Sequence, residues 1–74
     1  MEEKVLEILK RVFELESVDT TFSQETCEKW DSMSQLNLIV ELESEFDISI
    51  EPDDIDKMKS YNDIIRVISE IKQL

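Results

Sequence analysis

Apolar residues recur with the period of a helix in separate segments of the chain, and the period is lost between them. Residues 3–15 carry one apolar stripe, which predicts an amphipathic helix. Residues 16–30 collect Ser, Thr, Asp and Gln instead, so we expect a long loop there, held in place by Val18, Phe22 and Trp30. The stripe of the first segment consists of Val5, Ile8, Leu9, Val12 and Phe13.

The second half of the chain predicts three further helices. The first covers residues 32–46 and is followed by an extended link at residues 47–51. Pro52 fits the first turn of a short helix, because the N–H that proline lacks has no partner there. Ser60 fits the N-cap of the last helix, since Asp63 follows it at capping-box spacing. The last helix carries its apolar residues at Tyr61, Ile64, Ile65, Ile68 and Ile71.

These elements predict an all-α fold, a small four-helix bundle with a long first loop and a short third helix. The length of 74 residues allows one domain, expected over residues 1–74, and leaves no room for a second core. The absence of Gly argues against a sheet built on tight hairpin turns. Cys27 is the only cysteine, so no internal disulfide can form and a reducing, cytoplasmic location is expected. No apolar run is long enough to insert into a membrane.

The helix expected at residues 32–46 carries apolar side chains on two opposite faces. At 100° per residue, four of them fall together and would face the core, whereas three fall on the other side. A helix at the edge of a small bundle needs only one apolar face. We therefore expect the second face to dock a partner, with one of its residues covered by the short third helix and two exposed. The alternatives are that this helix covers the face or that the chain dimerises through it. The core face comprises Leu38, Ile39, Leu42 and Phe46; the second face comprises Met33, Leu36 and Val40.

Charge is distributed unevenly. The net charge is −11, and the stretch from Asp31 to Asp56 contains nine acidic residues and no Lys or Arg. Such a field repels nucleic acid and anionic membranes and speeds encounters with basic partners. We therefore expect a monomer that meets protein partners with basic docking patches. The acidic residues are Asp31, Glu41, Glu43, Glu45, Asp47, Glu51, Asp53, Asp54 and Asp56.

Catalysis and metal binding find little support in the sequence. The chain has no His, which excludes a Ser-His-Asp mechanism and leaves Cys27 without a histidine base. The acidic residues between Asp47 and Asp56 lack the Gly and the ligand spacing of a calcium-binding EF-hand loop. No catalytic residue and no metal ligand is assigned.

Ser32 stands out by its position. If Asp31 is the N-cap, Ser32 is the first residue of the helix, and its hydroxyl is not tied to a backbone N–H. A phosphate attached there would lie at the positive end of the helix dipole, beside unpaired N–H groups. The alternative is that Ser32 itself caps the helix, which is the commoner meaning of an isolated Asp-Ser pair. The surrounding sequence has to decide between the two.

That surrounding sequence resembles the acyl carrier protein family. The family signature is Asp-Ser-Leu, followed by a helix that ends in a Leu-Glu-x-x-Phe pattern. The resemblance extends over nearly the whole chain, including the acidic short helix and the final aliphatic helix. The matching segments are Asp31-Ser32-Met33, Leu42-Glu43-Ser44-Glu45-Phe46 and the link Ile48-Ser49-Ile50.

The resemblance implies that a separate phosphopantetheinyl transferase, with magnesium, transfers 4′-phosphopantetheine from coenzyme A to Ser32. The thiol of this covalent arm would hold an acyl group as a thioester, and the protein itself would not be an enzyme. Asp31 would help recruit the transferase and its metal. Acyl-transferring or acyl-activating enzymes would read a surface formed by Met33, Leu36, Val40, Glu41 and Asp47.

Three positions differ from the usual pattern of the family. Lys29 stands where Gly is common, Met33 replaces the usual Leu, and Asn37 occupies a position that is often acidic in carriers of fatty acid synthesis. These differences fit a stand-alone carrier of a specialised pathway at least as well as one of fatty acid synthesis. Two alternatives stay open: a carrier of aminoacyl or peptidyl groups such as D-alanine, and an interaction adaptor that is never modified.

Overall fold

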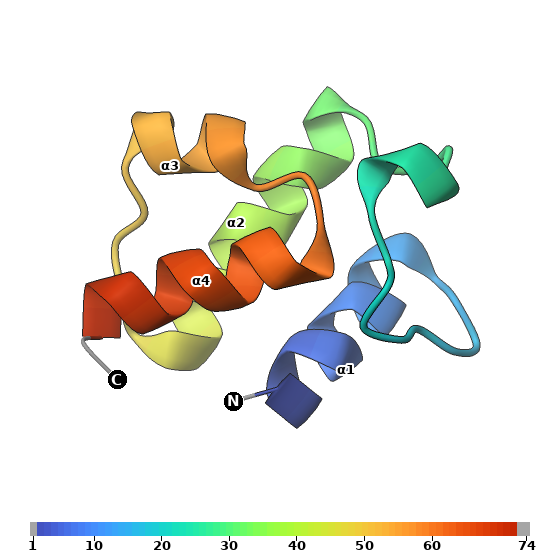
Figure 1. Ribbon diagram of the computed structural model, residues 1–74, viewed down its shortest axis with the longest axis horizontal. Helices are drawn as coiled ribbons and strands as arrows, with labels where there is room; N and C mark the ends of the chain where they lie inside the picture. Colours follow the sequence, from blue (N-terminus) through green and yellow to red (C-terminus); the bar gives the residue numbers. More distant parts are fainter. Residues whose placement is uncertain (1, 73–74) are drawn as a thin grey trace.

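The computed structural model describes residues 2–72, which form four α-helices and one 3₁₀ turn (Figure 1). The all-α fold with a long first loop and a short third helix is confirmed. Within the described range the only β-pairing is an isolated bridge between Ser23 and Ser60, and no helix is long and apolar enough to cross a membrane. The elements are α1 (Glu2–Phe13), the 3₁₀ turn (Gln24–Thr26), α2 (Ser32–Phe46), α3 (Pro52–Lys57) and α4 (Tyr61–Lys72).

Helix α1 ends at Phe13, two residues before the predicted end. Glu14 leaves the helix in the left-handed conformation, with φ 54°, and the N–H of Leu15 then donates to the carbonyl of Lys10 at 3.0 Å. This is a Schellman-type ending, in which glycine usually takes the left-handed position. The turn directs the half-buried Leu15 back against the core.

Helix α2 ends in the same way. Asp47 has φ 53° and ψ 54°, and its N–H donates to the carbonyl of Glu43. The N–H of Ile48 donates to the same carbonyl at 3.1 Å. A sequence without glycine therefore closes both helices with acidic residues in a conformation that their Cβ atoms disfavour.

The core lies between α1, α2 and α4, and α1 packs against both of the other helices. Helix α2 contributes Leu38, Ile39 and Leu42 to it, as predicted. Phe46, predicted as the fourth core residue of α2, is only half-buried, because it occupies the last turn, where the chain bends away into the link. The remaining buried residues are Val5, Ile8, Leu9, Phe13, Cys27, Trp30, Ile50, Met58, Tyr61, Ile64, Val67 and Ile68.

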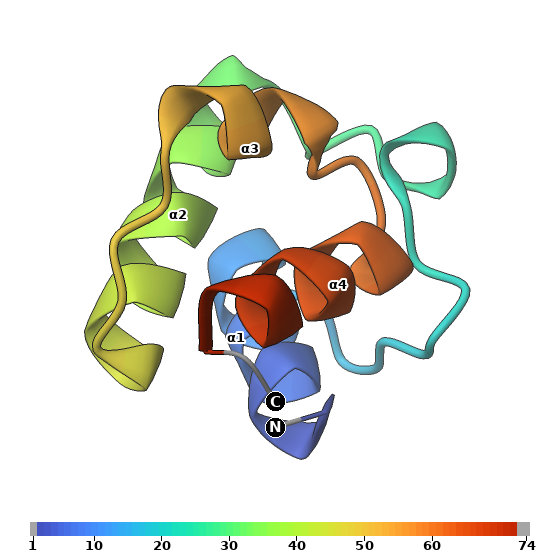
Figure 2. The ribbon, with the colours of Figure 1, turned by 60° about the vertical axis from the view of Figure 1, so that its left-hand side comes forward.

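The link between α2 and α3 runs back alongside α2, so that α3 lies by the N-terminal half of α2 (Figure 2). One hydrogen bond anchors this return path midway, because the N–H of Ile50 donates to Glu43 Oε2 at 2.8 Å. Helix α3 is six residues long and contains no fully buried residue. It is placed by its neighbours rather than by a core of its own.

The long first loop is held by aromatic packing, as expected. Phe13, Phe22 and Trp30 form a cluster in which the ring centroids lie 5.2 to 5.6 Å apart. Two backbone hydrogen bonds of 2.8 Å join the loop to the turn between α3 and α4: Gln24 N–H to the carbonyl of Lys59, and Tyr61 N–H to the carbonyl of Phe22. Trp30 therefore packs over the loop and is buried.

The N-terminus of α4 confirms Ser60 as a cap. Its hydroxyl oxygen accepts from the N–H of Asp63 at 3.1 Å. The carboxylate of Asp63 reaches back one residue further than in a capping box, because Asp63 Oδ2 accepts from the N–H of Lys59 at 3.1 Å. The turn between α3 and α4 is thereby fixed from both sides.

The left-handed turn at Glu14 predicts a stabilising substitution. Glu14→Gly removes the Cβ that this conformation strains, so we expect the midpoint of thermal unfolding to rise by about 2–8 °C, equivalent to about 0.5–1 kcal/mol. Circular dichroism at 222 nm measures it. Glu14→Ala is the matched control, since it removes the same charge but keeps the Cβ. An equal rise in both variants would attribute the gain to charge and refute the backbone explanation.

Candidate functional site

The N-terminus of α2 is capped by Asp31 and not by Ser32. Asp31 has extended backbone angles, φ −104° and ψ −173°, and its Oδ1 accepts from the N–H of Ser34 at 2.9 Å. Its carbonyl accepts from the N–H of Gln35 at 2.9 Å, which begins the helical pattern. Ser32 is therefore the first helical residue. Its side chain is exposed, and its hydroxyl has no hydrogen-bond partner among residues 2–72.

The cap also sets the charge of Asp31. Hydrogen bonds from Ser34, above all from its backbone N–H, lower the pKa of the Asp31 carboxyl below its ordinary value. Asp31 is consequently a carboxylate at neutral pH. A hydroxyl without a partner and an exposed carboxylate thus stand on consecutive residues at the start of α2.

Beside these two residues lies an open pocket of about 310 Å³. Its walls come from the start of α2, from α3 and from the turn between α3 and α4, which the return path of the link brings together (Figure 2). A volume of this size falls at the lower end of small-ligand sites. The lining residues are Gln24, Trp30, Asp31, Ser32, Gln35, Ile55, Asp56, Met58 and Lys59.

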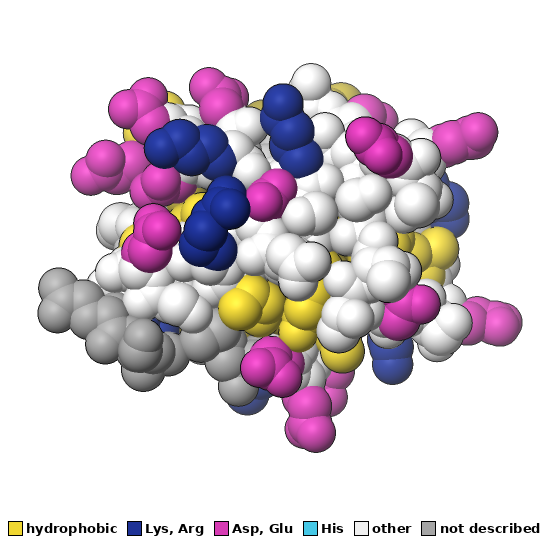
Figure 3. All heavy atoms as spheres, in the orientation of Figure 1, with side chains coloured by type: hydrophobic (Ala, Val, Ile, Leu, Met, Phe, Trp, Pro, Cys, Tyr) yellow, Lys and Arg dark blue, Asp and Glu magenta, His cyan; other side chains and the backbone are white. Residues whose placement is uncertain are grey.

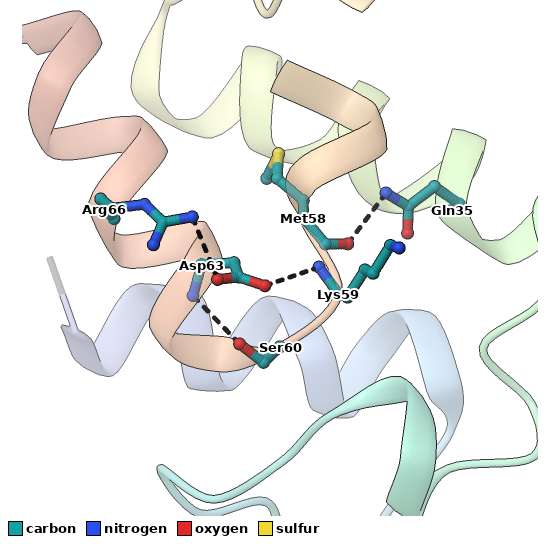
Figure 4. A network of polar contacts seen from close by, with 6 residues as sticks. All are labelled: Gln35, Met58, Lys59, Ser60, Asp63 and Arg66. Atoms are coloured by element: carbon teal, nitrogen blue, oxygen red, sulfur yellow. Dashed lines mark hydrogen bonds and ion pairs between the residues drawn. The ribbon is translucent and has the colours of Figure 1, made fainter. Parts of the chain in front are cut away.

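Gln35 holds the walls of this pocket together. Its Nε2 donates to the carbonyls of Ile55, at 2.9 Å, and Met58, at 3.1 Å, so that α2 is bonded to the end of α3 (Figure 4). Its Oε1 accepts from the indole N–H of Trp30. One carboxamide thus satisfies two carbonyls at the end of α3 and the indole of the first loop. The sequence did not single out Gln35, because a glutamine near a helix N-terminus carries no signal of contacts made twenty residues away.

The second apolar face of α2 is exposed. Met33, Leu36 and Val40 expose 78%, 61% and 63% of their surface, respectively. Coverage of this face by α3, whether whole or of one residue, is wrong, because all three side chains are exposed. Three neighbouring large apolar side chains in water are typical of a contact surface.

The two acidic residues expected beside this face have different surroundings. Glu41 accepts a charged hydrogen bond of 2.7 Å from Arg11 of α1. Asp47 lies in the left-handed turn at the far end of α2, is exposed, and makes no ion pair with a described residue. Along the same flank, Lys4 pairs with Glu45 at 2.6 Å, which raises the pKa of Lys4 and lowers that of Glu45. Helix α1 therefore already neutralises two acids of α2.

Acidic side chains gather over α3 and the link before it (Figure 3). Within the range 2–72, however, no group of three or more His, Cys, Asp or Glu side chains is arranged to hold a metal ion. Cys27, the one thiol, is buried. The chemical resources at the start of α2 are thus one hydroxyl, one carboxylate, the positive end of the helix dipole and the pocket.

Comparisons with known proteins agree with this arrangement. The family model described as "Phosphopantetheine attachment site" matches residues 3–68. A candidate acyl carrier protein from Mycobacterium tuberculosis has a similar structure, with a TM-score of 0.84 and 27% identity over 93% of this chain and 95% of that one. The solution structure of a holo acyl carrier protein from Geobacter metallireducens gives a TM-score of 0.85 and 26% identity over 97% of this chain and 85% of that one. Among curated proteins, no significant sequence match is found.

The contacts of Gln35 predict that Gln35→Glu detaches α3. A carboxylate offers no donor to the carbonyls of Ile55 and Met58, so we expect a loss of about 1–3 kcal/mol in unfolding free energy. Amide exchange in α3 should accelerate more than exchange in α1 and α4. Denaturant unfolding and amide exchange by NMR measure the two effects.

Asn37→Asp is the matched control, an amide-to-acid change on the exposed side of the same helix. It should leave exchange in α3 unchanged. Equal effects in the two variants would mean that added negative charge, and not the lost donor, loosens α3.

Proposed function

Since this chain belongs to the acyl carrier protein family, we propose that it carries acyl groups as thioesters on a 4′-phosphopantetheine arm attached to Ser32 and delivers them to partner enzymes. Members of this family are carriers and not enzymes, and their cofactor is covalently attached phosphopantetheine. They interact with a phosphopantetheinyl transferase and with acyl-handling enzymes. The attachment residue, the cargo and the docking surface are the parts that we propose for this chain.

One observation carries the choice of Ser32. Its hydroxyl is exposed and has no partner within residues 2–72, whereas the neighbouring Asp31 performs the capping that would otherwise occupy it. The residues around Ser32 also fit the group. The positive end of the α2 dipole favours a phosphate, and the adjacent pocket of about 310 Å³ offers a surface to the arm.

The chain's own residues would then share the work as follows. Ser32 presents its oxygen to the transferase, and the carboxylate of Asp31 attracts the magnesium that the transferase brings. The bound arm supplies the thiol that forms the thioester. The protein positions the arm, since α2 holds the attachment point beside the exposed apolar face.

We propose that Met33, Leu36 and Val40 form the apolar centre of the docking surface, with Glu41 and Asp47 at its edge. The partner is an acyl-transferring or acyl-activating enzyme with a basic patch, which complements the acidic residues of α2 and α3. Glu41 already faces Arg11, so a cation of the partner has to share or replace that pairing. Asp47 is free of such competition.

We also propose that residues 1–74 act as one carrier domain and as a monomer in the reducing cytoplasm. The buried single thiol of Cys27 supports this location, because the fold makes no use of a disulfide. A net charge of −11 opposes self-association through the apolar face.

Loading of the protein with phosphopantetheine by a transferase tests the attachment site. After incubation with a broad-specificity phosphopantetheinyl transferase, magnesium and coenzyme A, intact-mass measurement should show a gain of one phosphopantetheinyl unit in the wild type. Ser32→Ala should fold but gain nothing, and Ser34→Ala, a matched serine in the same turn, should load like the wild type. No gain in the wild type across several transferases would indicate an unmodified adaptor instead.

Two leucines on opposite faces of α2 test the docking surface. Leu36→Asp should preserve helicity but raise the KM of an acyl-activating partner enzyme for the holo-protein about tenfold or more, because about 1.5–3 kcal/mol of apolar contact is lost. Leu42→Asp, on the buried face, should unfold the protein. Unfolding by Leu36→Asp as well, or an unchanged KM, would contradict the assignment.

A further inference from the structure

An arm on Ser32 places a new negative charge in an already acidic part of the molecule. The carboxylate of Asp31 is adjacent, and Asp56 lines the same pocket. From Asp31 to Asp56 the sequence contains no Lys or Arg at all. A phosphodiester at this position would therefore meet repulsion unless a cation from another part of the chain lies nearby.

Most cations of the chain are already engaged. Of the eight Lys and Arg residues, five contact an acid or a carbonyl oxygen, and three have no partner within the described residues. Among these three, Lys59 alone lines the pocket beside Ser32. The engaged pairs are Lys4 with Glu45, Arg11 with Glu41, Arg66 with Asp63, Lys29 with the carbonyl of Phe13 and Lys72 with that of Phe46; the other three residues are Lys10, Lys57 and Lys59.

The backbone of Lys59 is fixed although its ammonium has no partner. Its N–H donates to Asp63 Oδ2 at 3.1 Å and to the carbonyl of Lys57 at 3.2 Å. Its carbonyl accepts from the N–H of Gln24 at 2.8 Å. The side chain extends away from Asp63, toward the side on which Gln35 lies (Figure 4). The ammonium is thus carried on an ordered turn, and Lys59 lines the same pocket as Ser32.

We propose that Lys59 binds the phosphate of the arm, so that its ammonium pairs with the phosphodiester on Ser32 across the pocket. This inference rests on the proposed function, because it requires the arm to be attached to Ser32. The pairing would connect the start of α2 to the turn between α3 and α4 and would offset the repulsion from Asp31 and Asp56. Loading would then change the stability of the protein as well as its chemistry.

The test compares unfolding before and after loading. For each protein, intact mass first establishes complete modification, and the midpoint of thermal unfolding is then measured for the apo- and holo-forms. Loading should change the midpoint of thermal unfolding in both proteins. At low salt, this change should be more positive in the wild type than in Lys59→Gln by about 1–6 °C. Salt at 1 M, where the Debye length is about 3 Å, should remove most of that difference.

Two variants control for charge and for position. Lys57→Gln removes one positive charge only two residues from Lys59, but from a side chain outside the pocket, and it should keep the wild-type shift. Lys59→Arg keeps the charge and should restore the shift. A second readout needs no substitution: NMR resonances of the Lys59 side chain should move on loading, whereas those of Lys57 should not.

The outcomes separate this inference from the proposed function. Complete loading with equal shifts in the wild type and Lys59→Gln, or with unmoved Lys59 resonances, overturns the role of Lys59 and leaves Ser32 as the attachment residue. Failure of the wild type to load overturns the proposed function and the pairing with it. Equal losses in Lys57→Gln and Lys59→Gln would attribute the effect to net charge and would also refute a specific role for Lys59.

Discussion

The arrangement of the molecule around Ser32 depends on the three hydrogen bonds of Gln35. Helix α3 has only six residues and buries none of them completely, so neither helix propensity nor its own core can keep it in place. The carboxamide of Gln35 bonds it to α2 and also satisfies the indole of Trp30. Because these groups line the pocket, the three bonds help to keep the shape of the space beside Ser32.

The contacts of α2 explain why one of its faces stays available. Ion pairs from Arg11 and Lys4 occupy the side toward α1, whereas Gln35 bonds to the end of α3 and Glu43 bonds to the link. The core takes the inward face, so only one stripe of the helix has no intramolecular task. A contact surface thus follows from how the other faces are used, and not merely from the hydrophobicity of three residues.

Much of the fold was predictable from local patterns, since helical periods, the cap at Asp31 and the two faces of α2 depend on residues close in sequence. The early end of α1 at Phe13 was not predictable, because nothing in the spacing of the apolar residues indicates that Glu14 is left-handed. The half-burial of Phe46 and the contacts of Gln35 depend on where the link returns α3, which is a tertiary property. For the site, Asp31 and Ser32 follow from sequence, whereas Lys59 enters the pocket only through the fold. The role of Ser32 as attachment residue stays a prediction.

The hydrogen bond between Trp30 and Gln35 has a practical consequence. The chain contains a single tryptophan, and its indole is bonded to the residue that holds α3. The emission spectrum of an indole depends on its hydration and on its polar neighbours. The protein therefore carries a native optical probe of the attachment of α3, and movements of the pocket wall can be followed without adding a label to so small a molecule.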